Sequence, residues 1–119
     1  MLNVSRCVLA LLMCLGTATA QKTPFRFAWL SDTHVGSSTG AADLSRSVHD
    51  INEMNDVTFV ILSGDITEMG FDIQLETARF RLHTLNKTKY IIPGNHDTKW
   101  TPSRCTKFLS LRGNERYVY

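Results

Sequence analysis

Apolar positions along the chain follow two spacings, one typical of strands and one typical of helices. Three short runs of β-branched, aromatic and aliphatic residues occupy residues 25–30, 57–62 and 90–92, and each is followed directly by residues such as Ser, Gly, Pro, Asn or Asp. Runs of this length, bounded by turn-forming residues, predict β-strands. The run 57–62 is apolar on both faces, which is typical of a buried parallel strand.

Between the predicted strands, apolar residues recur at helical spacing. In residues 41–55 they are Leu44, Val48, Ile51 and Met54, and in residues 71–86 they are Phe71, Leu75, Ala78, Leu82 and Leu85. Each set forms one apolar stripe along a helix. The order strand, helix, strand, helix, strand predicts two successive βαβ units, and hence an α/β fold with a parallel sheet. We expect Trp29, in the first strand, to lie in the core.

The N-terminal residues 1–20 have the pattern of a secretory signal peptide. A single basic residue precedes the apolar run 7–15, and Ala18-Thr19-Ala20 is typical of a cleavage site. We therefore expect export, and a domain over residues 21–119. The apolar run is shorter than the roughly 20 residues of a spanning helix, so we expect no stable membrane anchor after cleavage. A membrane anchor and a lipoprotein signal at Cys14 are the alternatives.

Composition and charge narrow the class of protein. The 119 residues are 43% hydrophobic and 20% charged, which excludes a collagen-like, low-complexity or mainly disordered chain. The net charge is +2 without a basic block, so no nucleic-acid partner is indicated. The three cysteines include no CxxC pair, and signal cleavage would leave Cys105 alone, with any disulfide partner in another chain.

Polar side chains follow each predicted strand. The clusters are Asp32-Thr33-His34, Gly64-Asp65 and Gly94-Asn95-His96-Asp97. Because parallel strands end at one edge of a sheet, we expect these side chains to share a location. Carboxylate, imidazole and amide ligands suit manganese, iron or zinc, and one aspartate can bridge two cations about 3.5–4 Å apart. No cysteine lies beside a predicted strand end, and P-loop and G-x-G-x-x-G motifs are absent from the sequence, which disfavours a cysteine nucleophile or a nucleotide cradle.

The motifs D-x-H, G-D and G-N-H-D, in this order, resemble those of the calcineurin-like metallophosphoesterases. The resemblance covers residues 25–119. It implies the N-terminal β-α-β-α-β part of a four-layer αββα sandwich. It also implies hydrolysis of phosphate esters, either phosphomonoesters or phosphodiesters.

The resemblance further implies two divalent or trivalent metal ions, manganese, iron or zinc. Asp32 and His34 would bind the first metal ion, Asp65 would bridge both ions, and Asn95 would bind the second. His96 would act near the leaving-group oxygen as a proton donor or electrostatic stabiliser. Glu68 is expected to hydrogen-bond near the second loop and not to be a ligand.

The resemblance gives Asp97 a supporting role, since this residue would orient His96 through a hydrogen bond.

The sequence departs from the family pattern because it lacks a further ligand histidine and the G-H-x-H motif. His49 and His83 lie in predicted helices and are expected to be surface or packing residues. The first metal ion would then have three protein ligands and the second two, whereas a catalytic metal normally has about three. We therefore expect an N-terminal part that binds at most one metal ion weakly, has little turnover alone, and exposes a sheet face meant for burial. A non-catalytic truncated product and a half-site completed by another chain are the alternatives; the sequence predicts no oligomeric state.

Overall fold

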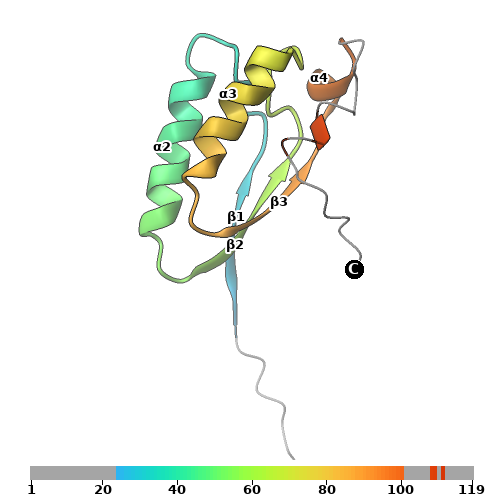
Figure 1. Ribbon diagram of the computed structural model, residues 1–119. Helices are drawn as coiled ribbons and strands as arrows, with labels where there is room; N and C mark the ends of the chain where they lie inside the picture. Colours follow the sequence, from blue (N-terminus) through green and yellow to red (C-terminus); the bar gives the residue numbers. More distant parts are fainter. Residues whose placement is uncertain (1–23, 101–107, 110, 112–119) are drawn as a thin grey trace, which may run out of the picture.

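The computed structural model describes residues 24–100, together with 108, 109 and 111. In this part, the elements follow one another as β1 (Arg26–Leu30), α2 (Gly40–Glu53), β2 (Val57–Ser63), α3 (Asp72–His83), β3 (Thr88–Ile92) and α4 (Asn95–Thr98) (Figure 1). The predicted signal peptide, Cys105 and residues 112–119 lie outside the described residues. Among the helices that are described, none has the length and apolar character needed to cross a membrane.

The three strands form one parallel sheet in the order β1-β2-β3. Phe27 pairs with Phe59, and Ile61 pairs with Tyr90. Right-handed crossovers between neighbouring parallel strands place successive helices on the same face. Both α2 and α3 lie on one side of the sheet, as Figure 1 shows. The predicted α/β fold with two βαβ units is confirmed.

Element boundaries differ from the prediction mainly at the ends. Helix α2 stops before Met54, which adopts an extended conformation with φ −80° and ψ 93°. Strand β3 begins at Thr88, two residues before the predicted run, because Thr88 pairs with Phe59 across the sheet. The four-residue helix α4 was not predicted, since Asn95–Thr98 carries no apolar stripe. This short helix places His96 beside the residues that follow β1 and β2, since its ring contacts that of His34 and its amide donates to Asp65.

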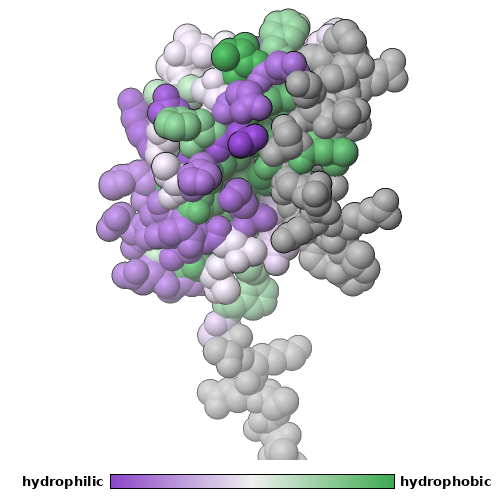
Figure 2. All heavy atoms as spheres, in the orientation of Figure 1, coloured by the Kyte–Doolittle hydropathy of each residue, from purple (hydrophilic) through white to green (hydrophobic). Residues whose placement is uncertain are grey.

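The core lies between the helices and the sheet. Val48 of α2 and Leu82 of α3 are buried, together with Val60 of β2. Met54 and Phe71 belong to the predicted apolar stripes, yet they are 44% and 47% exposed because they lie just beyond the helix ends. The outer surface of the helices is hydrophilic, and the purple atoms of Figure 2 gather over that side of the molecule.

The opposite face of the sheet carries aromatic side chains that the described residues leave partly open. The rings of Phe27 and Phe59 stack at 5.3 Å, and Tyr90 contacts Phe59 edge-on at 5.6 Å. The prediction that Trp29 lies in the core was wrong, since this residue is 69% exposed. Alternation along β1 turns Trp29 away from the helices, where its Nε1 donates to Oγ of Ser63. The exposed sheet face expected from the sequence is present.

Candidate metal centre

The loops after β1 and β2 run side by side beyond the sheet and bring the first two motifs together. The main-chain amide of Asp32 donates to the carbonyl of Gly64 at 3.2 Å, and that of His34 donates to the carbonyl of Asp65 at 3.1 Å. Val35 then pairs with the segment around Thr67 in an isolated parallel bridge. These main-chain bonds extend the pairing of β1 and β2, and they fix the D-x-H loop against the G-D loop.

The three residues predicted to bind the first metal ion share an uncommon backbone conformation. Asp32, His34 and Asp65 have φ of 55°, 43° and 50°, and they are the non-glycine residues with positive φ in the described part of the chain. Aspartate and histidine enter this left-handed region more readily than most residues, but still at a cost. Such conformations persist where the surroundings hold them, and they gather at functional sites. The backbone therefore marks the same three positions as the motifs.

The third motif docks directly onto the second. A side chain on Gly94 would place Cβ 2.0 Å from Oδ1 of Asp65 and 2.3 Å from the Asp65 main-chain nitrogen. Only glycine permits this approach. The main-chain amide of His96 then donates to Oδ1 of Asp65 at 3.0 Å. The close contact brings α4, whose first residue is the exposed Asn95, against the loop after β2.

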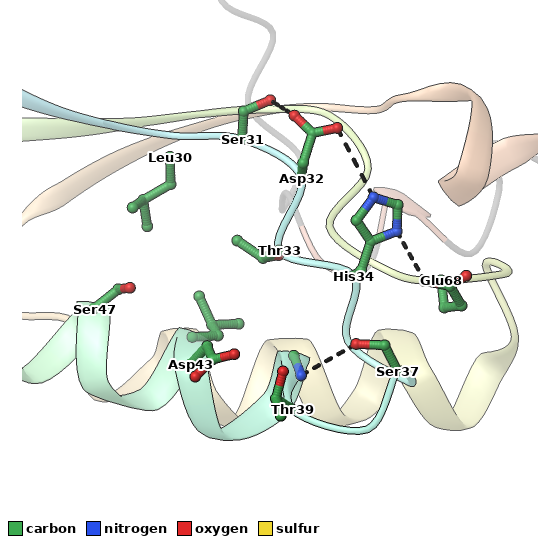
Figure 3. A pocket seen from close by; sticks show the side chains of 12 residues that line it. Leu30, Ser31, Asp32, Thr33, His34, Ser37, Thr39, Asp43, Ser47 and Glu68 are labelled. Atoms are coloured by element: carbon green, nitrogen blue, oxygen red, sulfur yellow. Dashed lines mark hydrogen bonds and ion pairs between the residues drawn. The ribbon is translucent and has the colours of Figure 1, made fainter.

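The side chains of Asp32, His34 and Asp65 form a set that could hold a cation. One ligand atom from each lies within 4.8 Å of the others, and Nε2 of His34 is 3.8 Å from Oδ1 of Asp32 (Figure 3). The Asp32 side chain is 65% exposed, so a cation can reach it from solvent. No lysine or arginine of the described residues forms an ion pair with Asp32 or Asp65. Two carboxylates and an imidazole without a cationic neighbour fit a divalent metal ion.

A second group of possible ligand atoms contains Glu68. One ligand atom each of His34, Glu68 and His96 lies within 4.8 Å of the others. Glu68 was expected to hydrogen-bond near the second loop, and its Oε2 lies 2.9 Å from Nδ1 of His34 in the first, D-x-H loop. In the sequence, the only indication that Glu68 belongs near the site was its position three residues after Asp65. This spacing does not show which loop the Glu68 side chain faces.

The imidazole of His96 faces Glu68 and the neighbouring carboxylates. Its Nδ1 lies 2.6 Å from the main-chain carbonyl oxygen of Glu68. This carbonyl raises the pKa of His96 above its usual value, burial opposes the change, and the charges of Asp65, Glu68 and Asp97 add to it. An imidazole that keeps its proton to higher pH is suited to donating a proton or stabilising negative charge.

The contacts of Asp97 differ from the prediction. Its side chain is fully buried. Its carboxylate oxygens accept hydrogen bonds from the amides of Ile66 and Thr67 at 3.2 and 2.8 Å, from Oγ1 of Thr67 at 2.7 Å, and from the Gly94 amide at 2.9 Å. The predicted hydrogen bond to His96 is replaced by these contacts, because the four donors face the carboxylate from two loops. Asp97 thus ties the second loop to the third.

A cavity of about 600 Å³ opens beside Asp32 and His34, between the D-x-H loop and the start of α2 (Figure 3). Its lining is rich in hydroxyl groups, including those of Ser31, Thr33 and Ser47, and contains no lysine or arginine. A phosphate bound here would receive no positive charge from a lysine or arginine of that lining. The two remaining candidate histidines of the sequence, His49 and His83, are exposed on α2 and α3, as expected.

Comparison with known proteins agrees with this geometry. The family model for the calcineurin-like phosphoesterases matches residues 25–118, which contain all three motifs. No curated protein matches the chain. The family match confirms the resemblance seen in the motifs, and the three parallel strands agree with the N-terminal part of that fold.

Proposed function

The chain belongs to the calcineurin-like phosphoesterase family, and from this premise we propose that its sheet edge is the metal-binding, catalytic part of a phosphoester hydrolase. The proposal depends above all on one observation: Asp32, His34 and Asp65 combine left-handed backbones with ligand atoms that lie within 4.8 Å of one another. Strain at three positions that lie together in two loops is unexpected if these loops serve only to connect elements.

The proposed metal ligands divide into two sets. Asp32, His34 and Asp65 hold the first ion, and Asp65 together with Asn95 holds the second. Manganese, iron and zinc all suit carboxylate, imidazole and amide donors. Bound metal ions supply Lewis acidity to the phosphoryl oxygens and activate water for attack. The substrates are phosphomonoesters or phosphodiesters.

His96 is proposed to act on the leaving group. The Glu68 carbonyl holds Nδ1 of the ring, so Nε2 is the nitrogen that remains to face a substrate. A proton on His96 can compensate part of the charge that develops on the leaving oxygen.

A second candidate function is metal binding without turnover. Asp65 and Asn95 are the described residues proposed for the second ion, one fewer than the three protein ligands a catalytic metal normally has. The chain would then bind one ion and be inactive by itself, as an N-terminal part of such an enzyme, or form a half-site that another chain completes. The aromatic sheet face left open among the described residues favours this candidate.

We also propose that the protein is exported. The support is the sequence pattern of residues 1–20, in which an apolar run precedes a small-residue cleavage site. Detection of the mature N-terminus at Gln21 in the exported fraction tests this proposal.

One experiment separates the two functions. The full chain and its Asp65→Asn variant are titrated with Mn²⁺ and assayed on an aryl phosphate monoester and diester. Metal-dependent hydrolysis well above that of the variant supports the hydrolase. Mn²⁺ binding that the variant weakens, without hydrolysis, supports the second candidate. Equal or absent binding in both proteins contradicts both functions.

A further inference from the structure

Glu68 contacts both imidazoles of the site. Its carboxylate Oε2 lies 2.9 Å from Nδ1 of His34, and its main-chain carbonyl oxygen lies 2.6 Å from Nδ1 of His96. The two rings meet edge to face with centroids 4.9 Å apart. The Glu68 amide donates to the carbonyl of Val35 at 3.0 Å, which fixes its main chain to the D-x-H loop. One residue therefore touches the side chains of two different loops.

The contact with His34 decides which ring nitrogen carries the proton. Nδ1 of His34 is shielded from solvent and lacks a well-aligned hydrogen-bond partner among the described residues. The Glu68 carboxylate, whose side chain is 39% exposed, is its ion-pair neighbour at 2.9 Å. A carboxylate only accepts hydrogen bonds, so the pair holds the proton on Nδ1. The lone pair is then on Nε2, which faces Asp32.

The contact with His96 has the same effect through the main chain. A carbonyl oxygen also only accepts, so it holds a proton on Nδ1 of His96. Both rings thus turn Nδ1 toward Glu68. Because the carboxylate contacts one ring and the carbonyl the other, removing the side chain breaks the contact with His34 and leaves the carbonyl contact with His96 in place.

We infer that Glu68 is a positioning residue of the metal centre, which fixes the tautomer of His34 so that Nε2 points at the metal. The inference rests on the proposed metal site at Asp32, His34 and Asp65. A carboxylate behind a ligating imidazole orients the ring and makes its other nitrogen a stronger donor. Figure 3 shows Asp32 and Glu68 on opposite sides of the His34 ring.

Direct ligation by Glu68 is the competing arrangement, since its carboxylate and both histidines offer atoms within 4.8 Å of one another. The geometry favours positioning. The nitrogen of His34 nearest Glu68 is the shielded Nδ1, and Nδ1 of His96 already contacts the Glu68 carbonyl. A cation bound to Nδ1 of His96 would have to displace that contact.

Ring tautomers test the inference without any metal. The full chain is labelled with ¹⁵N, and the ring nitrogens of His34 and His96 are observed by NMR at a pH where both rings are neutral. In the wild type, we expect both rings to be protonated at Nδ1. In Glu68→Ala, His34 should lose this preference and His96 should keep it, because the carbonyl remains. Glu68→Gln retains an acceptor oxygen and should keep both. An unchanged His34 tautomer in Glu68→Ala overturns the inference.

Metal affinity provides the second arm. The Mn²⁺ dissociation constant, measured from the EPR signal of free Mn²⁺, should rise about 10–100-fold in Glu68→Ala and less in Glu68→Gln. Glu76→Ala, which alters an exposed carboxylate of α3, is the matched control and should not change it. A Glu68→Ala constant equal to the control overturns the inference. Loss in Glu68→Gln as complete as in Asp65→Asn makes Glu68 a ligand and also overturns it. If the wild type binds no Mn²⁺, the proposed function fails, while the tautomers still decide the role of Glu68.

Discussion

Asp32 and Asp97 follow the first and third strands of one sheet, but the structure surrounds them in opposite ways. The side chain of Asp32 is 65% exposed, and its described contacts are the neighbouring Ser31 hydroxyl and the ring of His34. Asp97 is fully buried, and its oxygens accept four hydrogen bonds from two loops. The same side chain at the same sheet edge is therefore open in one loop and saturated in the other.

The difference lies in the donors that each loop provides. The loop after β2 directs the amides of Ile66 and Thr67 at Asp97, so that its acceptor capacity is used within the protein. The D-x-H loop instead uses its amides for pairing with the main chain after β2, which leaves the Asp32 carboxylate available. A carboxylate whose lone pairs are filled supports the fold, and an open one can bind a cation. Substitutions at the two positions should separate these roles.

The largest effect is expected for Asp97→Ala. This change leaves the buried amides of Ile66 and Thr67 and the half-buried amide of Gly94 without their acceptor, and each unsatisfied donor is costly. We expect the free energy of unfolding to fall by about 4 kcal/mol, measured by urea denaturation of the metal-free chain. Asp97→Asn, which keeps one carbonyl oxygen, should lose less. A loss below that of an exposed substitution such as Glu76→Ala would refute the supporting role of Asp97.

Gly94→Ala is expected to have the next largest effect, because Gly94 contacts both the buried Asp97 and the proposed metal ligand Asp65. Its amide donates to Asp97, and an added Cβ would fall 2.0 Å from Oδ1 of Asp65. Overpacking of this kind costs about 1–3 kcal/mol. Displacement of Asp65 should also weaken Mn²⁺ binding. Urea denaturation measures the change in stability, and titration calorimetry measures the change in Mn²⁺ affinity. Unchanged stability together with unchanged affinity would show that the two loops are not in close contact.

The sequence predicted the fold and the location of the site better than it predicted individual roles. Hydrophobic spacing gave the strands and helices because each element buries one face, and the strand ends then placed the polar motifs together. The hydrogen-bond partners of Asp97 were missed because three of the four are main-chain amides, which have no residue-specific pattern in the sequence. The exposure of Trp29 was missed for a similar reason, since an aromatic strand residue looks alike on either face of a sheet.

Thr67→Val should have a smaller effect that sharpens the comparison. The buried hydroxyl of Thr67 donates to Asp97 at 2.7 Å and accepts from the Gly70 amide at 3.1 Å. Valine keeps the shape but loses both bonds, so we expect about 1–2 kcal/mol less stability by urea denaturation. Thr77→Val is the matched control, since that hydroxyl bonds only to a carbonyl of its own helix and the change should stay within about 0.5 kcal/mol. Equal losses in both variants would contradict the network around Asp97.

Asp32→Asn should have the smallest effect on stability, and it therefore gives the clearest contrast with Asp97→Ala. Asparagine also adopts the left-handed backbone that position 32 requires, and the substitution leaves no buried donor unsatisfied. The free energy of unfolding of the metal-free chain should therefore change by no more than about 0.5 kcal/mol. The same substitution removes a negative ligand, so the Mn²⁺ dissociation constant should rise at least about tenfold, a change of roughly 1.4 kcal/mol in binding. If Asp32→Asn destabilised the chain as much as Asp97→Ala and left Mn²⁺ affinity unchanged, the open carboxylate would be a supporting residue as well. Because one variant reports both quantities, the result separates a ligand from a structural residue without relying on catalytic activity.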